Sequence, residues 1–319
     1  MISICIPAYK HVALTYESSL SVLNQNADVE LVVLDDFYLV ESSHEIRKSI
    51  EALRDLLHSD PRVKCYSNEK QLTIQDNWNK AVSLCTGSYV KLIGADDKML
   101  PGSITKMQSM ILDQPTVEFH GHLANIIDAQ GNLVRRQREY SDQFVKRPLS
   151  RGEALKGKLR QQVRFKEPAC NFFHKNAWQK VGGYGTKFRF VFDVDFNCRL
   201  MYSSTSMLWN ETLVELRRHQ ASDGAQLPAT LALLDLAGLA EVIMSLLGPS
   251  CTRQDRAAAD GWVLYRLIEL LAQRGRNRPS EMLKLLSANL GLFTKNPASY
   301  YWMLKLMTGR ILNNDVQQD

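Results

Sequence analysis

Several signatures that would assign a chain to a common class of protein are missing from these 319 residues. No window approaches the roughly 18 uninterrupted apolar residues that a membrane-spanning helix needs, and MISICIPAYK at the N-terminus has no basic region before its short apolar run. The six cysteines form no C-x-x-C pair, and several stand in apolar stretches, which is typical of small core residues. We therefore expect neither secretion nor a membrane span, and a reducing cytoplasm is the location that fits best.

The motifs of three enzyme classes are also missing or incomplete. No G-x-G-x-x-G follows the first strand-like run, which argues against a dinucleotide oxidoreductase, and no G-x-S-x-G supports a serine hydrolase. GEALKGKL (152–159) comes close to a phosphate-binding P-loop, but Leu159 stands where the magnesium-binding Ser or Thr is required, and no strand precedes it. The nucleotide chemistry of the chain, if any, must therefore rest on other residues.

Composition sets only broad limits. With 45 % hydrophobic residues the chain can bury the core of one large domain or two. The formal net charge of +5 is modest and dispersed, so we expect no nucleic-acid partner.

Short apolar runs alternate with helical patterns between residue 2 and about residue 112. Strand-like runs such as ISICIP, ELVVLDD and YVKLI are separated by ALTYESSLSVLNQ, HEIRKSIEALRDLLHS and IQDNWNKAVSLC, which have helical spacing. The alternation predicts an α/β fold with a Rossmann-like, mostly parallel sheet and helices on both faces. In such a sheet, ligands bind beyond the carboxyl ends of the strands.

The pattern changes twice further along the chain. VEFHGHLANIIDAQGNLVRR (117–136) predicts two short strands around the turn DAQGN, so the sheet should gain mixed or antiparallel strands there. After SDGAQLP (222–228) the pattern is almost wholly helical to about residue 310. We therefore predict an α/β domain over residues 1–224 and an all-helical C-terminal region over residues 225–319.

Two pairs of adjacent carboxylates follow strand-like runs. Asp35 and Asp36 end ELVVLDD, while Asp96 and Asp97 end YVKLIGADD, so both pairs should lie at one edge of a parallel sheet. A single Asp after a strand is usually a turn residue or a helix cap, but two such pairs at one edge weaken that interpretation. Mg²⁺ and Mn²⁺ prefer carboxylate oxygens and fill their remaining positions with phosphates and water. The pair Asp96 and Asp97 therefore suits a metal ion that carries a diphosphate.

Two further groups of polar residues are less specific. Asp193 and Asp195 precede an apolar helical run, and their spacing puts them on different helix faces, so only one should point at a site. A helix cap with a solvated first-turn acid is an equal alternative for this pair. His120 and His122 could share a strand face, but no further Cys or His completes a zinc set nearby, so we interpret them as structural.

Five segments of the chain follow one another in an order known from one protein family. The first strand lies in SICIPAYK, and the first acid pair ends SLSVLNQNADVELVVLDD. The second acid pair lies in NWNKAVSLCTGSYVKLIGADDKMLPGSI. VGGYGTKFRFVFDVDFNCRL and ELRRHQAS carry a glycine turn before an acidic helix start and a late R-x-H. Over roughly residues 2–222, this series resembles the nucleotide-sugar glycosyltransferases of family 2, which have the GT-A fold.

The resemblance implies roles for residues that bind the donor. Pro7, Ala8 and Tyr9 would line the nucleotide, with Tyr9 beside the base or the ribose. Asp36, together with Asp35, would hydrogen-bond the base.

The resemblance also implies a metal site and a catalytic base. Asp96 and Asp97 would hold Mg²⁺ or Mn²⁺ against the donor diphosphate, and His219 matches a late histidine that approaches the metal or the diphosphate. Asp193 corresponds to the catalytic base of the family, six residues before Arg199.

Three positions depart from the pattern of the family. Gly94 stands where the first Asp of D-x-D-D is often found, Phe192 replaces the Glu before the base, and Phe37 replaces a Gly after the first acid pair. The first two changes remove carboxylates, so a catalytically degenerate protein that binds a nucleotide-sugar or a glycan stays an alternative. A nucleotidyltransferase is a weaker alternative, because PAYKHVALT has no glycine for a signature loop.

The resemblance implies an inverting, metal-dependent, hexosyltransferase-type glycosyltransferase. It would move a sugar from a UDP-, dTDP- or GDP-sugar to a hydroxyl of a glycan or lipid-linked acceptor in surface polysaccharide biosynthesis, in the cytoplasm or at the inner face of the membrane. PASYYWMLKLMTGRILNN (297–314) predicts a helix docked on the catalytic domain, with an interfacial membrane helix as the alternative. Association into a homo-oligomer through the C-terminal helices is left open.

Overall fold

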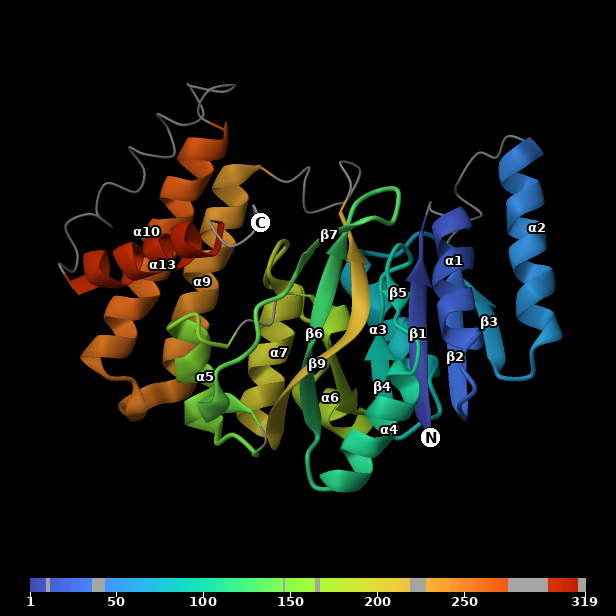
Figure 1. The fold of residues 1–319 in the computed structure, drawn as a ribbon, viewed down its shortest axis with the longest axis horizontal. Coiled ribbons are helices and arrows are strands. Elements are labelled where there is room, and N and C mark those ends of the chain that lie inside the picture. The colour runs from blue at the N-terminus through green and yellow to red at the C-terminus, as the bar shows by residue number, and fades with distance from the viewer. Residues whose placement is uncertain are drawn as a thin grey trace. The chain divides into compact units, whose positions relative to one another are not determined.

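The computed structural model describes residues 1–9, 12–35, 44–145, 147–163, 167–218, 228–274 and 298–314 (Figure 1). Contacts divide the chain into two compact units. Unit 1 comprises Met1–Arg151, Phe165–Lys187 and Phe192–Ser222, and unit 2 comprises Gly152–Arg164, Phe188–Val191 and Asp223–Asp319. The domain division predicted at residue 224 stays a prediction. It did not anticipate the two earlier segments of unit 2, because their membership depends on contacts with residues far along the chain.

Unit 1 is built on a nine-stranded mixed sheet in the order β3-β2-β1-β4-β8-β6-β9-β5, with β7 paired to β6. The four strands at the β3 end are parallel to one another; β8 is antiparallel to β4 and β6, and β9 is parallel to β6. The mostly parallel start and the antiparallel hairpin around DAQGN confirm the predicted fold class. The strands are β1 (Ile2–Ala8), β2 (Val29–Asp35), β3 (Val63–Ser67), β4 (Tyr89–Leu92), β5 (Lys98–Met99), β6 (Phe119–Ile127), β7 (Leu133–Arg136), β8 (Asn171–His174) and β9 (Ser206–Arg217).

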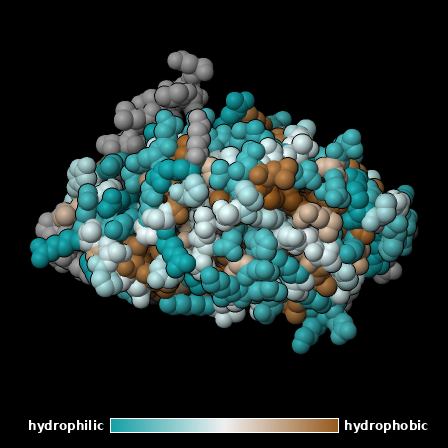
Figure 2. Space-filling model, turned by 90° about the horizontal axis from the view of Figure 1, so that it is seen from below, coloured by the Kyte–Doolittle hydropathy of each residue, from teal (hydrophilic) through white to brown (hydrophobic). Residues whose placement is uncertain are grey.

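The buried carboxylate of Glu30 lies at the edge of the sheet where the parallel strands begin. Glu30 in β2 accepts hydrogen bonds from Lys64 Nζ (2.6 Å) and from the backbone nitrogen and hydroxyl of Thr86 (2.7 and 2.8 Å). Burial alone would raise the pKa of Glu30, but the hydrogen bonds from Lys64, Ser3 and Thr86 outweigh it and hold the pKa at about 2. The surface on this side is mostly hydrophilic, with hydrophobic side chains in small separate groups (Figure 2).

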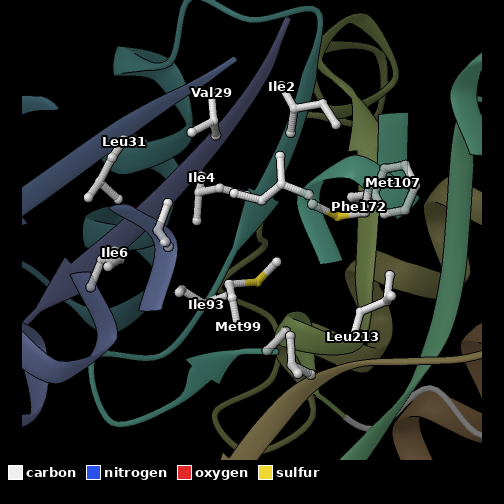
Figure 3. Packing of buried hydrophobic residues seen from close by; sticks show 14 of the residues in the cluster. Ile2, Ile4, Ile6, Val29, Leu31, Ile93, Met99, Met107, Phe172 and Leu213 are labelled. Carbon is white, nitrogen blue, oxygen red and sulfur yellow. The ribbon is translucent and has the colours of Figure 1, made fainter. Parts of the chain in front are cut away.

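The core of unit 1 lies on the face of β1 that carries Ile2, Ile4 and Ile6, since alternate residues of a strand share a face. Helices α1 and α4 cover this face, and α3 packs on the other (Figure 1). Ile93 and Met99, which flank the GADD segment, are both buried in the same core (Figure 3). The helices of unit 1 are α1 (Val12–Leu23), α2 (His44–Ser59), α3 (Ile74–Leu84), α4 (Ser103–Asp113), α6 (Lys175–Val181) and α7 (Phe192–Ser203), with 3-10 turns at Asp142–Phe144 and Pro168–Cys170.

The regular secondary structure described in unit 2 is helical. Its helices are α5 (Arg151–Leu159), α9 (Ala229–Leu247), α10 (Arg253–Arg274) and α13 (Ala298–Asn314), with a 3-10 turn at Gly248–Ser250. The P-loop-like GEALKGKL thus lies within a helix and forms no loop. In α13, Trp302 is buried with Ala257 and Ala258 of α10, while Tyr301 is exposed.

Helix α9 is more apolar than the sequence analysis allowed for. By length and composition alone, Leu231–Ser250 is long enough and apolar enough to cross a membrane. Asp235 and Glu241 interrupt the apolar run, so the sequence pattern alone did not predict a membrane span there. Of this stretch, 44 % is buried inside the protein, and core helices of soluble proteins pass the same criterion. These features of α9 therefore do not assign it to a membrane.

Asp255 anchors the first turn of α10. Its carboxylate accepts hydrogen bonds from Arg160 (2.6 and 3.0 Å) and from the backbone nitrogen (3.0 Å) and hydroxyl (2.7 Å) of Thr252. Thr252 in turn accepts a hydrogen bond from the backbone nitrogen of Asp255 (3.2 Å), which completes a capping box. The side chain of Asp255 is fully buried.

We expect Asp255→Ala to lower the free energy of unfolding by about 2–3 kcal/mol, because buried donors lose their acceptor. Arg160 is about a quarter exposed, which keeps the loss below that of a fully buried pair. Hydrogen bonds from Thr252 and Arg160 outweigh burial and lower the pKa of Asp255, so the deficit should shrink as the pH falls below about 4. Urea unfolding followed by circular dichroism measures both effects. The exposed neighbour variant Gln254→Ala should stay within about 0.5 kcal/mol of the wild type, and an equal loss in both variants would contradict the assignment.

Candidate active site

The carboxyl ends of β1 and β2 bring the predicted donor-binding residues together. Ala8 pairs with Asp35 across the two strands, and Pro7 pairs with Leu34. Tyr9 follows directly, and its hydroxyl accepts a hydrogen bond from Gln71 Nε2 (3.0 Å). Pro7, Ala8, Tyr9 and Asp35 therefore lie at one edge of the sheet, as expected for strands that run in parallel.

The carboxylate of Asp35 is buried and only partly satisfied. Its Oδ2 accepts a hydrogen bond from Ser67 Oγ (3.0 Å) and lies 3.9 Å from Arg54. No hydrogen bond from the described residues reaches its buried Oδ1. A buried acceptor without a donor is costly, so this oxygen is a place where a ligand N–H would be favoured. Asp36, predicted to bind the base, His219, predicted to approach the metal or the diphosphate, and the departure at Phe37 lie outside the described residues.

The segment after β4 turns two carboxylates toward one point. The turn is closed by hydrogen bonds from Asp97 N to Gly94 O (3.2 Å) and from Gly94 N to Asp97 Oδ2 (3.3 Å). A Cβ atom added to Gly94 would lie 2.7 Å from Asp96 Oδ1 and 2.8 Å from Asp97 Oδ2. The missing side chain at position 94 therefore leaves room that both carboxylates border.

The pKa of Asp97 is shifted in the opposite direction from that of Glu30. Burial, and next the charge of Asp96, raise the pKa of Asp97 to about 8, although the backbone N–H of Arg217 lowers it (3.1 Å to Oδ1). Glu30 has a cation and three donors, whereas Asp97 is placed beside a second anion. A divalent cation would remove this conflict, and two carboxylate oxygens are ligands that Mg²⁺ and Mn²⁺ accept.

Arg217, at the end of β9, is hydrogen-bonded to both acids of the Gly94–Asp97 turn. Its Nε donates to the carbonyl of Asp96 (3.1 Å), its backbone nitrogen donates to Asp97, and its guanidinium also reaches the carbonyl of Ala129 (3.0 Å) and Glu17 Oε2 (2.8 Å). The side chain is 3 % exposed. In the sequence, Arg217 stands out only as part of an R-x-H. Its structural role could not be predicted, because its contacts come from segments up to 200 residues apart.

Lys91 is a second cation that the sequence analysis missed. It is fully buried in β4, and its Nζ lies 2.7 Å from His122 Nε2 and donates to the carbonyls of Ala169 (2.6 Å) and Asn171 (3.3 Å). Burial lowers the pKa of Lys91 to about 7, while the charge of Asp97 favours its protonated form. His122 is thus tied to Lys91, which agrees with the structural interpretation of HGH.

Asp193 and Asp195 have different surroundings in the first turn of α7. Asp195 is buried and its Oδ2 accepts from Arg199 Nε (2.8 Å), whose other nitrogens donate to the carbonyls of Val181 and Gly183. Asp193 is partly exposed. The carboxylate of Asp195 therefore holds the glycine turn against α7, while that of Asp193 accepts a hydrogen bond from the backbone nitrogen of Val194 (2.8 Å).

The topology places Asp193 toward the same edge as the other acids. β9 runs in the same direction as β1, because β6 and β4 are both antiparallel to β8. Helix α7 ends at Ser203, just before β9 begins, so its 12 residues run back over about 18 Å toward the carboxyl edge (Figure 1).

Phe192, the position where the family usually has Glu, belongs to an aromatic cluster. Its ring lies 5.0 Å from that of Trp78 and 6.2 Å from that of Tyr184, and the side chain is buried. Position 192 thus faces the interior here, which explains why an apolar side chain is accommodated.

A mixed sheet flanked by helices, with acids at the carboxyl ends of β2 and β4 and a further acid opening α7, fits the GT-A class of nucleotide-sugar transferases. The chain belongs to glycosyl transferase family 2, whose family model matches residues 3–182, and it is a glycosyltransferase.

Solved structures of glycosyltransferases share the fold. S. aureus TarS in complex with UDP-GlcNAc has a TM-score of 0.60 at 12 % identity, over 91 % of this chain and 81 % of that one. The mannosyltransferase PcManGT from Pyrobaculum calidifontis, in complex with GDP-Man and Mn²⁺, has a TM-score of 0.56 at 13 % identity, over 100 % and 88 % of the two chains.

Curated relatives are more similar in sequence. An uncharacterized protein of Mycobacterium tuberculosis is 26 % identical over 273 residues, which cover 82 % of this chain and 81 % of the relative. An uncharacterized glycosyltransferase of Haemophilus influenzae is 26 % identical over 136 residues, which cover 42 % of this chain and 51 % of the relative.

Proposed function

We propose that this glycosyltransferase is inverting and metal-dependent, and that it transfers a sugar from a nucleotide-diphosphate sugar to a hydroxyl of a glycan or lipid-linked acceptor in surface polysaccharide biosynthesis. The observation that carries the proposal is the pair Asp96 and Asp97, whose carboxylates border one space beside Gly94. Membership of glycosyl transferase family 2 supports the reaction class.

The residues present fit Mg²⁺ or Mn²⁺. In the described ranges, no group of three or more His, Cys, Asp or Glu side chains comes together as a metal cage. Asp96 and Asp97 would therefore supply two oxygens, with His219 as a further proposed ligand and the donor phosphates completing the shell. When bound, the ion would neutralise the charge that develops on the departing diphosphate.

The nucleotide would bind where β1 and β2 end. Oδ1 of Asp35, which accepts no hydrogen bond from the part of the chain that the structure describes, would accept an N–H of the base, with Asp36 as its proposed partner. Pro7, Ala8 and Tyr9 would border the base and ribose. TarS is seen with UDP-GlcNAc and PcManGT with GDP-Man, so UDP-, GDP- and dTDP-sugars are the donors to test.

Asp193 is proposed as the general base. Its carboxylate would take the proton of the acceptor hydroxyl as that oxygen attacks the anomeric carbon from the face opposite the diphosphate, and the anomeric configuration inverts. The bond from the sugar to the diphosphate breaks in the same step, so no covalent enzyme intermediate forms.

The cellular context is part of the proposal. Five of the six cysteines are buried, which supports a cytoplasmic location where thiols act as core residues. Peripheral attachment to the membrane and self-association through the C-terminal helices are left to flotation and sedimentation measurements.

A thermal-shift screen tests the donor and the metal together. We expect one of the UDP-, GDP- or dTDP-sugars to raise the melting temperature in the presence of Mn²⁺ or Mg²⁺, and much less in EDTA. A donor at 100 times its Kd stabilises the folded state by about 2.7 kcal/mol, which corresponds to a shift of roughly 4 °C for a chain of this size. Equal shifts with and without metal would contradict metal dependence, and no shift with any donor would contradict the proposed function.

A catalytically degenerate binding protein is the second candidate. It is favoured by the loss of two carboxylates, at Gly94 and at Phe192, whose ring is buried among aromatic side chains. Metal-dependent release of nucleoside diphosphate in the absence of acceptor separates the two candidates, because only a transferase has a base that can activate water in place of the acceptor.

A further inference from the structure

A short irregular segment, Phe188–Val191, leads directly into the helix that presents Asp193. The segment contains no helix or strand, so no ladder of backbone hydrogen bonds fixes its course. It groups with unit 2, although the residues on both sides of it belong to unit 1. Its conformation must therefore be set by contacts with the helices of unit 2.

Asp235 of α9 supplies the polar contact. Its Oδ2 accepts hydrogen bonds from two successive backbone nitrogens, those of Arg189 (2.8 Å) and Phe190 (2.6 Å). Successive N–H groups that converge on one anion form a nest, which specifies the local backbone conformation. The bonded amides lie four and three residues before Asp193.

Gly238, one helical turn after Asp235, supplies the apolar contact. A Cβ atom on Gly238 would lie 2.9 Å from Cε1 of Phe188, so the ring of Phe188 packs directly against the helix backbone. Phe188 is 4 % exposed. Two positions on one face of α9 thus hold the two ends of the same three-residue stretch.

Burial of the Asp235 carboxylate within α9 is unfavourable in free energy. Asp235 is buried in the middle of ATLALLDLAGLAEVIMSLL, which is otherwise almost entirely apolar. A helix that served only to pack would be better off with an apolar residue there, because a buried charge must be offset by hydrogen bonds. The hydrogen bonds given to Asp235 are those of the segment before α7.

We propose that Asp235 is a positioning residue for the transfer reaction: it fixes the backbone of Phe188–Val191 and thereby the direction in which α7 begins and Asp193 points. The link from α9 to Asp193 then runs through the chain itself, from Phe188–Val191 into α7. The inference rests on the proposed role of Asp193 as the base.

The test uses the full chain with four single variants. Asp235→Ala removes both hydrogen bonds, and Asp235→Asn keeps one oxygen as an acceptor. Gly238→Ala keeps Asp235 but displaces Phe188, and it introduces the better helix former, so a loss would not come from a weakened helix. Glu241→Gln, an exposed carboxylate on the same helix, is the matched control.

Two readouts are compared in the same preparations. The first is amide hydrogen exchange of peptides covering residues 186–197. The second is the metal-dependent hydrolysis of the nucleotide-sugar that stabilises the wild type, at saturating donor, together with the Kd of that donor. We expect Asp235→Ala to speed exchange at Arg189 and Phe190 at least 10-fold and to slow hydrolysis about 10-fold or more, with the Kd changed less than 2-fold. Gly238→Ala should act in the same direction, Asp235→Asn should recover part of the rate, and Glu241→Gln should match the wild type.

Three results would overturn the proposal. One is faster exchange in the segment with an unchanged hydrolysis rate, and another is unchanged exchange in Asp235→Ala. The third is an equal loss of rate and donor affinity in both Asp235→Ala and Gly238→Ala, which would mean general damage to the fold. Failure of the proposed function is seen separately, because the wild type itself would then show no donor-dependent hydrolysis.

Discussion

Asp193→Asn is expected to slow metal-dependent hydrolysis of the donor by about 100- to 10,000-fold, the range that a general base contributes. The substitution keeps the size of the side chain but removes its ability to take a proton. Donor affinity should change less than about 3-fold, because Asp193 acts on the acceptor and has no proposed contact with the nucleotide. Release of nucleoside diphosphate measures the rate, and calorimetric titration with the donor measures the affinity.

Asp195→Asn is the matched control, two residues along the same helical turn. Its carboxylate is bonded to Arg199, which holds the glycine turn. We therefore expect it to lower the melting temperature more than Asp193→Asn does, and to reduce the hydrolysis rate much less. If Asp193→Asn kept a rate near that of the wild type, the base would have to be sought elsewhere.

Gly94→Ala is expected to weaken metal-dependent donor binding at least 10-fold, which is about 1.4 kcal/mol. The added Cβ would lie 2.7 and 2.8 Å from the two carboxylate oxygens, closer than folded proteins tolerate, so both side chains must turn away. The displaced atoms are the ends of side chains, so the fold should persist and the melting temperature without ligand should stay nearly unchanged. Titration with Mn²⁺ at a fixed donor concentration measures the effect.

Two further variants sharpen this expectation. Gly152→Ala is the control, because its Cβ would meet no atom closer than 4.0 Å. Gly94→Asp restores the first Asp of D-x-D-D. It should also weaken metal-dependent donor binding, because its Cβ has the same short contacts. Tighter Mn²⁺ binding in Gly94→Asp would show that the two carboxylates rearrange freely, and that the space beside Gly94 is not what the metal needs.

The order of strands and helices in unit 1 could be predicted because its signals are local. ISICIP, ELVVLDD and YVKLI are mainly apolar runs that suit strands buried on both faces, and β1, β2 and β4 are indeed buried along their full length. DAQGN closes a hairpin through Asp128 and Gly131, residues that favour turns. Membership of the family followed from the same ordered motifs.

The supports of the candidate site could not be predicted in this way. A lysine within YVKLI gives no sign that its ammonium is buried against His122. The roles of Arg217 and Asp235 depend on partners that are distant in the chain, and the motif analysis compared only neighbouring residues. The roles assigned to Asp36 and His219 stay predictions, since both lie outside the described residues.

The way Arg217 holds the acid turn bears on how such a protein can evolve. Its Nε donates to the backbone carbonyl of Asp96 (3.1 Å), and this bond does not require an acidic group at position 96. At position 96, the residue that holds the backbone and the residue that supplies the acid are thus different, and they lie more than a hundred positions apart. A lineage can therefore exchange the acid at position 96 and keep the course of the turn, so that both new donor chemistry and loss of catalysis are within reach of a single substitution.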